Sequence, residues 1–200
     1  MCYASPIQTF NPAAPSLNFM QVSPARYTRT AMLLHWVMAL LIFFLFGLGW
    51  WMSDLPETSV RAVPFAIHKS VGLLVFTLLW VRLFWRLMNP PPPLPAGVEE
   101  WKRVLSRWVH RTIYLLLVLQ PVSGYLSSSF TGHKTSFFGI PLPQWGWKNE
   151  PLNFLFTDIH TGISEVLLVY IIIHVIGAVS HMVQRDGVIY RMLPLRRDWF

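Results

Sequence analysis

The sequence predicts an all-α membrane protein built as a bundle of four transmembrane helices. The first observation is composition: of the 200 residues, 54% are hydrophobic and only 12% are charged, whereas soluble domains carry about 25% charged residues. The second is that four stretches are long and apolar enough to cross a bilayer. The third is that histidines recur inside these stretches. The four stretches are residues 31–52, 64–87, 108–127 and 154–183.

The distribution of basic residues predicts the orientation of the chain. Twelve of the 16 lysines and arginines precede the first stretch, cluster around the connection between the second and third, or follow the fourth. Because the chain crosses four times, these residues share one side, and the positive-inside rule makes that side cytoplasmic. We therefore expect a multi-pass protein of a bacterial inner membrane, with both termini cytoplasmic and with lipid, not nucleic acid, as its partner. The other side carries only Arg61, Lys69, Lys134 and Lys148.

Three segments differ from the apolar stretches. Residues 1–25 contain four prolines and no apolar run, so we expect a disordered extension ahead of one transmembrane domain at 26–200. Residues 89–95, NPPPPLP, cannot continue a helix and predict a stiff extended link. Residues 130–153 hold glycines, prolines, Trp145 and Trp147, and they predict a structured outer loop at the membrane interface.

Four histidines inside the apolar stretches pair by depth. His160 and His174 are 14 residues apart, so both lie on one face of a helix and about 21 Å apart along its axis. With cytoplasmic termini, His35 and His174 fall near the inner surface, and His68 and His160 fall near the outer one. An ionisable side chain inside a membrane is a candidate functional residue.

Paired imidazoles at two depths are the ligands that two haems would need. Neutral imidazole is a standard ligand of haem iron, so the bundle is expected to enclose two haems, held by His35 with His174 and by His68 with His160. No CxxCH motif is present, which predicts non-covalent, b-type haem. The single cysteine, Cys2, excludes a cysteine-ligated iron–sulfur cluster. A di-iron carboxylate site lacks the inward glutamates that it requires.

Glycines fall at the depths of the expected haems. Gly49 is 14 residues beyond His35, Gly72 is one turn below His68, and Gly177 follows His174 by three residues. Two interpretations fit these positions equally well. The glycines leave room for a flat macrocycle, or they let transmembrane helices pack closely.

Several motifs together resemble the bacterial cytochrome b561 family. These are LLHW at 33–36, HKSVG at 68–72, VRLFWRL at 81–87 and SHMVQRDGVIYRMLP at 180–194. The family consists of four-helix, di-haem membrane cytochromes related to the b subunits of nickel–iron hydrogenases. The resemblance implies the same four histidine ligands. Thr161 departs from it, because many members carry a glutamate at this position.

Three further residues are candidates at the inner surface. His181 lies seven residues beyond His174, on the same helix face, and His110 stands at a similar level. Either ring could border a quinone site, where an imidazole can relay protons, or could simply be solvated at the interface. Arg82 lies 14 residues below His68, where its guanidinium could pair with haem propionates or reach lipid phosphates.

Three functions fit the sequence. The first is an oxidoreductase that carries electrons from an outer donor through both haems to ubiquinone. Small family members of this kind resemble the superoxide oxidase, and Lys69, Arg61 and Lys134 would attract an anion to the outer surface. The second is a haem b subunit that anchors a periplasmic dehydrogenase or hydrogenase and accepts its electrons. The third, a non-redox scaffold or haem carrier, explains the paired histidines least well.

Overall fold

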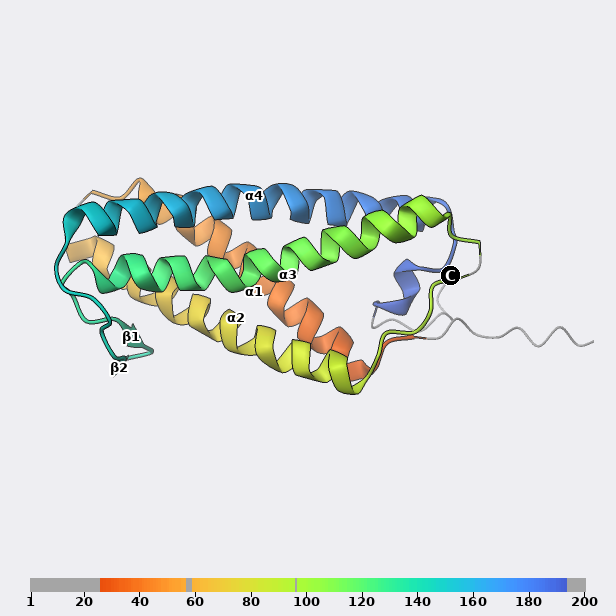
Figure 1. The fold of residues 1–200 in the computed structure, drawn as a ribbon, viewed down its shortest axis with the longest axis horizontal. Coiled ribbons are helices and arrows are strands. Elements are labelled where there is room, and N and C mark those ends of the chain that lie inside the picture. The colour runs from red at the N-terminus through yellow and green to blue at the C-terminus, as the bar shows by residue number, and fades with distance from the viewer. Residues whose placement is uncertain (1–25, 57–58, 96, 194–200) are drawn as a thin grey trace, which may run out of the picture.

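The structure, a computed structural model, consists mainly of four long helices (Figure 1). It describes residues 26–56, 59–95 and 97–193, so the extension expected at 1–25 lies outside the described residues. Each apolar stretch identified in the sequence falls within one helix. The helices are α1 (Arg29–Ser53), α2 (Ala62–Met88), α3 (Glu100–Ser129) and α4 (Glu150–Val183). Shorter elements are the 3-10 turns η1 (Ser59–Arg61) and η2 (Ile189–Arg191) and the strands β1 (Ser136–Phe137) and β2 (Ile140–Pro141).

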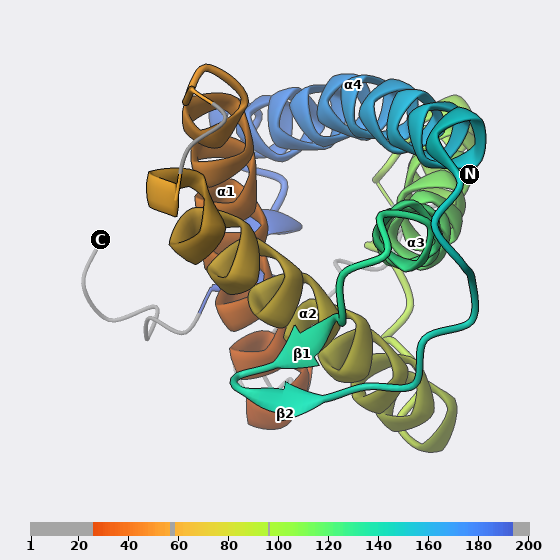
Figure 2. The same ribbon diagram turned by 90° about the vertical axis from the view of Figure 1, so that its left-hand side faces the viewer.

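The helices form two antiparallel hairpins that lie against each other. Helix α1 packs on α2, α3 packs on α4, and α2 contacts α3. Viewed from one end, the four helices form the four sides of the bundle (Figure 2). We call the end where α1 and α3 begin and α2 and α4 finish the terminal end. The opposite end, where β1 pairs with β2, is the hairpin end.

Three of the four helices are long and apolar enough to cross a membrane. Within the described residues these are α1, α2 with its preceding 3-10 turn, and α4. Helix α3 is long enough, at 30 residues, but it is not apolar enough, so the expectation of four apolar spans holds for three. The prediction of a helical membrane bundle stands, with one helix more polar than expected.

Polar residues in the hairpin-end half of α3 find hydrogen-bond partners within the protein. Its serine hydroxyls are therefore satisfied without water. Ser127 pairs with Thr157 of α4, with 2.7 Å between the hydroxyl oxygens. Ser128 pairs with Thr135 of the following loop at 2.6 Å. At the terminal end, α3 begins in a charged turn where Arg107 pairs with Glu100 at 3.3 Å.

The protein core is small and draws on all four helices. Leu79 of α2 is fully buried at its centre. Large apolar side chains on the outer faces are exposed instead, including Leu40 at 69% and Ile176 at 62%. Such faces suit a hydrocarbon solvent. The buried core residues are Met38, Val75, Leu79, Leu116, Leu117 and Leu167.

The link between the hairpins and the chain after α4 close the terminal end. Helix α2 finishes at Met88, directly before the proline run, as the sequence predicted, because proline cannot continue a helix. The segment after α4 then returns across this end. Arg191 is buried and donates to the carbonyl of Pro92, while its own carbonyl accepts from the Tyr27 amide at 3.2 Å.

The loop after α3 is structured, also as predicted, but it spans residues 130–149, because α4 begins at Glu150, four residues before the expected start. Its β1–β2 hairpin docks on α2, where the Phe138 amide donates to the Ser70 hydroxyl at 3.0 Å. Asn149 caps α4 by accepting from the Leu152 amide at 3.1 Å, a standard helix start. Trp145 and Trp147 remain 75% and 68% exposed.

Truncation of Leu79 tests where the core lies. Leu79→Ala removes packing contacts at the centre of the bundle and should destabilise the protein by about 2 kcal/mol or more. The matched control is Leu40→Ala on the exposed face of α1, which should change stability by less than about 0.5 kcal/mol. Unfolding followed by circular dichroism in detergent measures both. Equal losses would contradict this position of the core.

Candidate functional site

Two histidines from different hairpins face each other at the terminal end. His35 lies in the second turn of α1 and His174 lies in the last third of α4. Their ring centroids are 6.1 Å apart, and the ring planes are inclined by 77°. The ring centroids of Trp36 and His35 are 5.4 Å apart, and the Trp36 indole N–H donates to the Met192 carbonyl at 3.0 Å. The segment after α4 is therefore attached directly beside His35.

A third imidazole belongs to this cluster. His110 of α3 lies with its ring centroid 5.0 Å from that of His174, edge to face. Its Nδ1 lies 2.6 Å from the Ser106 carbonyl, so the proton on Nδ1 is donated to that oxygen and Nε2 is left as an acceptor. Sequence reasoning placed His110 at this level, and the structure brings it into contact with His174.

Arg82 connects three helices at the terminal end. Its Nε donates to the Tyr114 hydroxyl of α3 at 3.0 Å. One Nη donates to the Ala31 carbonyl of α1 at 2.9 Å, one turn before His35. These two bonds account for part of the donor set of the guanidinium, which has five N–H groups. Arg86 lies near the same Tyr114 ring, 5.8 Å from its centroid.

The second pair of histidines lies at the hairpin end. His68 of α2 and His160 of α4 have centroids 6.2 Å apart and ring planes inclined by 77°, nearly the same geometry as the first pair. Because α4 is continuous between His160 and His174, the two pairs are about 21 Å apart along the bundle. The Nδ1 of His68 is buried and has no hydrogen-bond partner among the described residues.

Glycines stand directly behind the rings of the hairpin-end pair. A Cβ on Gly49 of α1 would lie 3.4 Å from Cε1 of His68. A side chain at Gly49 would thus face this imidazole at an ordinary contact distance, a neighbour that neither interpretation of the sequence named. A Cβ on Gly72 or Gly177 would meet no atom within 4 Å, so these two glycines do not serve close contact between helices.

Helix α3 supports His160 through residues that sequence reasoning missed. Nδ1 of His160 lies 2.9 Å from the Gln120 carbonyl oxygen and 3.2 Å from the Ser123 hydroxyl. The Gln120 side-chain amide lies 3.2 Å from Nε2 of the same ring, and its Oε1 is buried without a hydrogen-bond partner. A Cβ on Gly124 would lie 2.9 Å from Cε1 of His160. The sequence signal for this support of His160 was a glutamine, a proline and a glycine within five residues, 120–124, of one helix.

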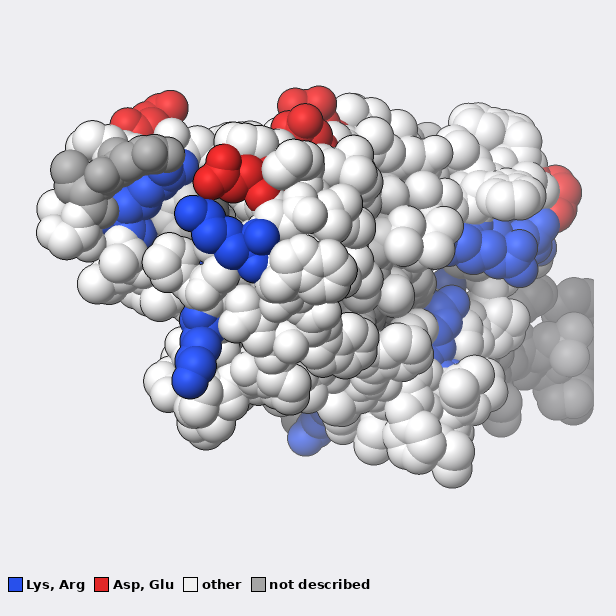
Figure 3. Space-filling model, turned by 60° about the vertical axis from the view of Figure 1, so that its left-hand side comes forward, with Lys and Arg blue, Asp and Glu red and all other residues white. Residues whose placement is uncertain are grey.

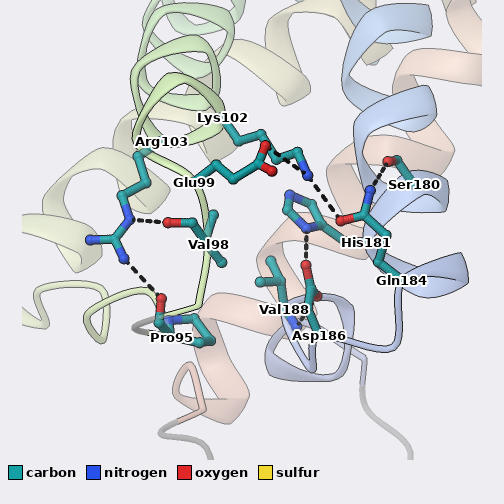
Figure 4. A network of polar contacts seen from close by, with 10 residues as sticks. All are labelled: Pro95, Val98, Glu99, Lys102, Arg103, Ser180, His181, Gln184, Asp186 and Val188. Atoms are coloured by element: carbon teal, nitrogen blue, oxygen red, sulfur yellow. Dashed lines mark hydrogen bonds and ion pairs between the residues drawn. The ribbon is translucent and has the colours of Figure 1, made fainter.

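His181 takes part in a polar network beyond the terminal-end pair (Figure 4). Its Nδ1 bonds to the Asp186 carboxylate, and the Val188 amide donates to the other oxygen of that carboxylate at 3.0 Å. Beside it, Lys102 of α3 bridges Glu99 and Gln184 at 3.3 Å and 3.0 Å. The network ties the start of α3 to the chain that leaves α4.

The comparisons with known proteins agree with this architecture. The family model of prokaryotic cytochrome b561 matches residues 26–195. The chain belongs to the prokaryotic cytochrome b561 family. This cytochrome b561 is 30% identical over 183 residues to "Cytochrome b561 homolog 2" of Escherichia coli K12, with 86% of this chain and 93% of the relative covered. It is 22% identical over 177 residues to "Cytochrome b561 homolog 1" of the same organism, covering 86% and 99%.

A third relative carries an enzymatic name. The chain is 26% identical over 168 residues to "Probable superoxide oxidase CybB" of Yersinia pestis, with 82% of this chain and 93% of the relative covered. The family transfers electrons in membranes and binds b-type haem. The resemblance stated from the sequence motifs is thus confirmed.

The two histidine pairs fit a bis-imidazole haem. An imidazole nitrogen binds a metal at about 2 Å, so two rings on opposite sides of one iron have centroids about 6.3 Å apart. The measured separations are 6.1 Å and 6.2 Å. The donor chemistry also fits, because at the hairpin end the unpartnered polar atoms of His68 and Gln120 lie around the same rings. Within the described residues, no group of three or more His, Cys, Asp or Glu side chains is arranged to hold a metal ion.

Charges lie toward the two ends of the molecule. In Figure 3, basic side chains appear at both ends of this face, with a wide uncharged area between them. At the hairpin end, Arg61 lies over the Phe65 ring, 4.8 Å from its centroid. Lys69 directly follows His68 in α2, and Lys148 pairs with Glu150 at 3.5 Å.

Proposed function

We propose that this cytochrome b561 carries electrons across a bacterial inner membrane, from a donor at the outer surface to ubiquinone at the cytoplasmic surface. The observation that carries the proposal is that two imidazole pairs meet edge to face, with 6.1 Å and 6.2 Å between ring centroids, at the two ends of one helical bundle. Neither pair has another chemical reason to be buried in an apolar bundle, since an ionisable residue is costly there.

In this proposal each pair holds one b-type haem. His35 and His174 would hold the haem at the terminal end, and His68 and His160 would hold the one at the hairpin end. Bound haem would supply reversible one-electron transfer. The protein keeps the ligand rings in place through neighbouring helices, and the apolar faces of α1, α2 and α4 keep the sites away from bulk water.

The terminal end is the cytoplasmic end in this proposal. Most basic residues lie before α1 or in its first turn, in the last two turns of α2, in the first half of α3, or after α4. Those among them that the structure describes are at the terminal end. The positive-inside rule therefore favours cytoplasmic termini. Helix α3 runs along α4, so it crosses the membrane too, although its composition is less apolar. Its polar groups find their partners within the protein.

We place the quinone site near His181 at the terminal end. The Asp186 carboxylate accepts from Nδ1 of His181, and in the imidazolium form of the ring Nε2 carries a second proton, which it would donate to a quinone oxygen. Reduction of a quinone to a quinol consumes protons, and an imidazole backed by a carboxylate is a common proton donor. His110 and Arg82 lie on the bundle side of this position, and Arg82 retains donors for a haem propionate.

The outer donor is proposed to be superoxide. Lys69 lies beside the ligand His68, and Arg61 and Lys134 belong to the same end. These cations would raise the local concentration of a small anion. The relative named as a probable superoxide oxidase, matched over 93% of its length, supports this choice.

A second candidate donor is a periplasmic dehydrogenase or hydrogenase bound to the hairpin end. The exposed apolar surface of the 130–149 loop favours it. Phe138, Ile140, Trp145 and Trp147 are each at least 60% exposed there, and aromatic residues are enriched at protein interfaces. Recovery of such an enzyme with this protein from membranes would favour this alternative.

The haem assignment predicts two separable spectral components. The purified protein should contain two non-covalent, low-spin b-type haems by pyridine haemochromogen and absorption spectra. His68→Ala or His160→Ala should remove one component, and His35→Ala or His174→Ala the other, because each haem loses one of its two axial ligands. Loss of the same component in His68→Ala and His174→Ala would contradict the pairing.

The donor assignment predicts that superoxide reduces the protein directly. Superoxide generated enzymatically should reduce the haems, and added ubiquinone should reoxidise them. Lys69→Gln should slow the reduction several-fold at low ionic strength and less in high salt, because steering by charge is screened. Lys148→Gln is the matched control, since Lys148 is already paired with Glu150. Failure of superoxide to reduce the wild-type haems would favour the subunit alternative.

The quinone assignment predicts a selective defect. His181→Ala should slow oxidation of the reduced haems by added quinone while both haem spectra stay intact, because the variant removes a proton donor and no ligand. His133→Ala, on the exposed loop at the opposite end, should leave the rate unchanged. Stopped-flow absorption measures both rates. A wild-type rate in His181→Ala would leave His181 as an interfacial residue.

A further inference from the structure

We propose that helix α3, which supplies no histidine to either pair, controls the hairpin-end haem by holding His160 through the Gln120 carbonyl and the gap at Gly124. The inference rests on the proposed ligation by His160 and adds positioning residues to it. Of the two ring nitrogens of His160, one would bind iron and the other would make a hydrogen bond to the protein. That hydrogen bond decides which tautomer the imidazole adopts and how strongly the ring donates to a metal.

The hydrogen bond to Gln120 selects one tautomer of His160. A backbone carbonyl only accepts, so Nδ1, which lies 2.9 Å from it, must carry the proton. Nε2 then carries the lone pair, which in the structure accepts from the Gln120 side chain, and binding to iron would replace that hydrogen bond. The Gln120 side-chain amide, 3.2 Å from Nε2, is consistent with the same tautomer because an amide N–H donates.

Gly124 makes this hydrogen bond sterically possible. It lies one helical turn after Gln120, and a side chain at that place would project back over the Gln120 carbonyl. A Cβ on Gly124 would lie 2.9 Å from Cε1 and 3.0 Å from Nδ1 of His160. Such a contact is too close for carbon, so any side chain would push the ring away from the carbonyl. The imidazole lies against the bare backbone of α3.

The terminal-end pair has no counterpart of this arrangement. Among the described residues, neither His35 nor His174 makes a hydrogen bond; their neighbours are aromatic rings. A ligand imidazole that donates its second N–H becomes more basic, which stabilises the ferric state of the iron it binds. The contact with α3 therefore lowers the reduction potential of the hairpin-end haem and leaves the other haem unaffected.

Gly124→Ala is the direct test. Spectroelectrochemical titration of the haem-loaded variant should show a higher midpoint potential, or loss of the low-spin signal, for the component that His160→Ala removes. The second component should titrate as in wild type. Gly47→Ala is one control, because Gly47 is exposed on α1 and a Cβ there meets nothing within 4 Å.

Gly49→Ala is a second, closer control. Its Cβ would touch His68, the other imidazole of the same pair, at an ordinary contact distance of 3.4 Å, and it would break no hydrogen bond. Its midpoint potentials should match those of wild type. If Gly124→Ala shifts neither component, or shifts both equally, Gly124 serves only helix packing and the inference is wrong.

A measurement on the unaltered sequence covers the case in which Gly124→Ala does not fold. Redox-induced infrared difference spectra of protein labelled with ¹⁵N-histidine report hydrogen bonding at Nδ1 of ligating imidazoles. One ligand should show a strongly hydrogen-bonded Nδ1–H, and its signal should disappear in His160→Ala. Uniformly weak bonding at every ligand would overturn the inference. Absence of haem from the wild-type protein would instead contradict the proposed function.

Discussion

The geometry of the whole bundle depends on one constraint, which is that α4 supplies a ring to both histidine pairs. His160 and His174 lie on one face of a continuous helix, so the partner of each ring must come from a helix that crosses that face at the right depth. His35 of α1 and His68 of α2 meet this requirement because α1 and α2 pack as an antiparallel hairpin. The two hairpins are thereby fixed opposite each other.

Helix α3 resolves the cost of polar chemistry in an apolar bundle. Polar groups buried in such a bundle must find their partners within the protein, because water is excluded. The polar residues that make α3 too hydrophilic to resemble a membrane span are the ones that provide these partners at the hairpin end. Gln120 and Ser123 bond to His160, and Ser127 bonds to Thr157 on the same face of α4. The polarity of α3 is therefore part of the site.

The two ends of the bundle are held by different means. At the hairpin end, glycine backbones of α1 and α3 lie against the imidazoles. At the terminal end, long side chains connect the helices by hydrogen bonds. Arg82 joins α2 to α1 and α3, and Trp36 joins α1 to the segment after α4. The His181–Asp186 pair fixes the turn by which that segment leaves α4. The terminal end is thus ordered by charged and polar side-chain contacts.

The sequence by itself determined the class of the protein, its helices and the depth of its histidines. These features depend on local composition and on the fixed rise of a helix, so His160 and His174 could be assigned to opposite ends from their spacing alone. The end of α2 before the prolines at 90–93 and the structured loop after α3 were predicted for the same local reason.

The tertiary structure decided what lies around those histidines. Spacing gives the depth of a residue but not which neighbouring helix approaches it or which backbone groups it meets. Gly49 was therefore not recognised as a neighbour of His68, and Gln120, Ser123 and Gly124 were not recognised at all. Their contacts with His160 join residues about 40 positions apart, and only the packing of α3 against α4 brings them together.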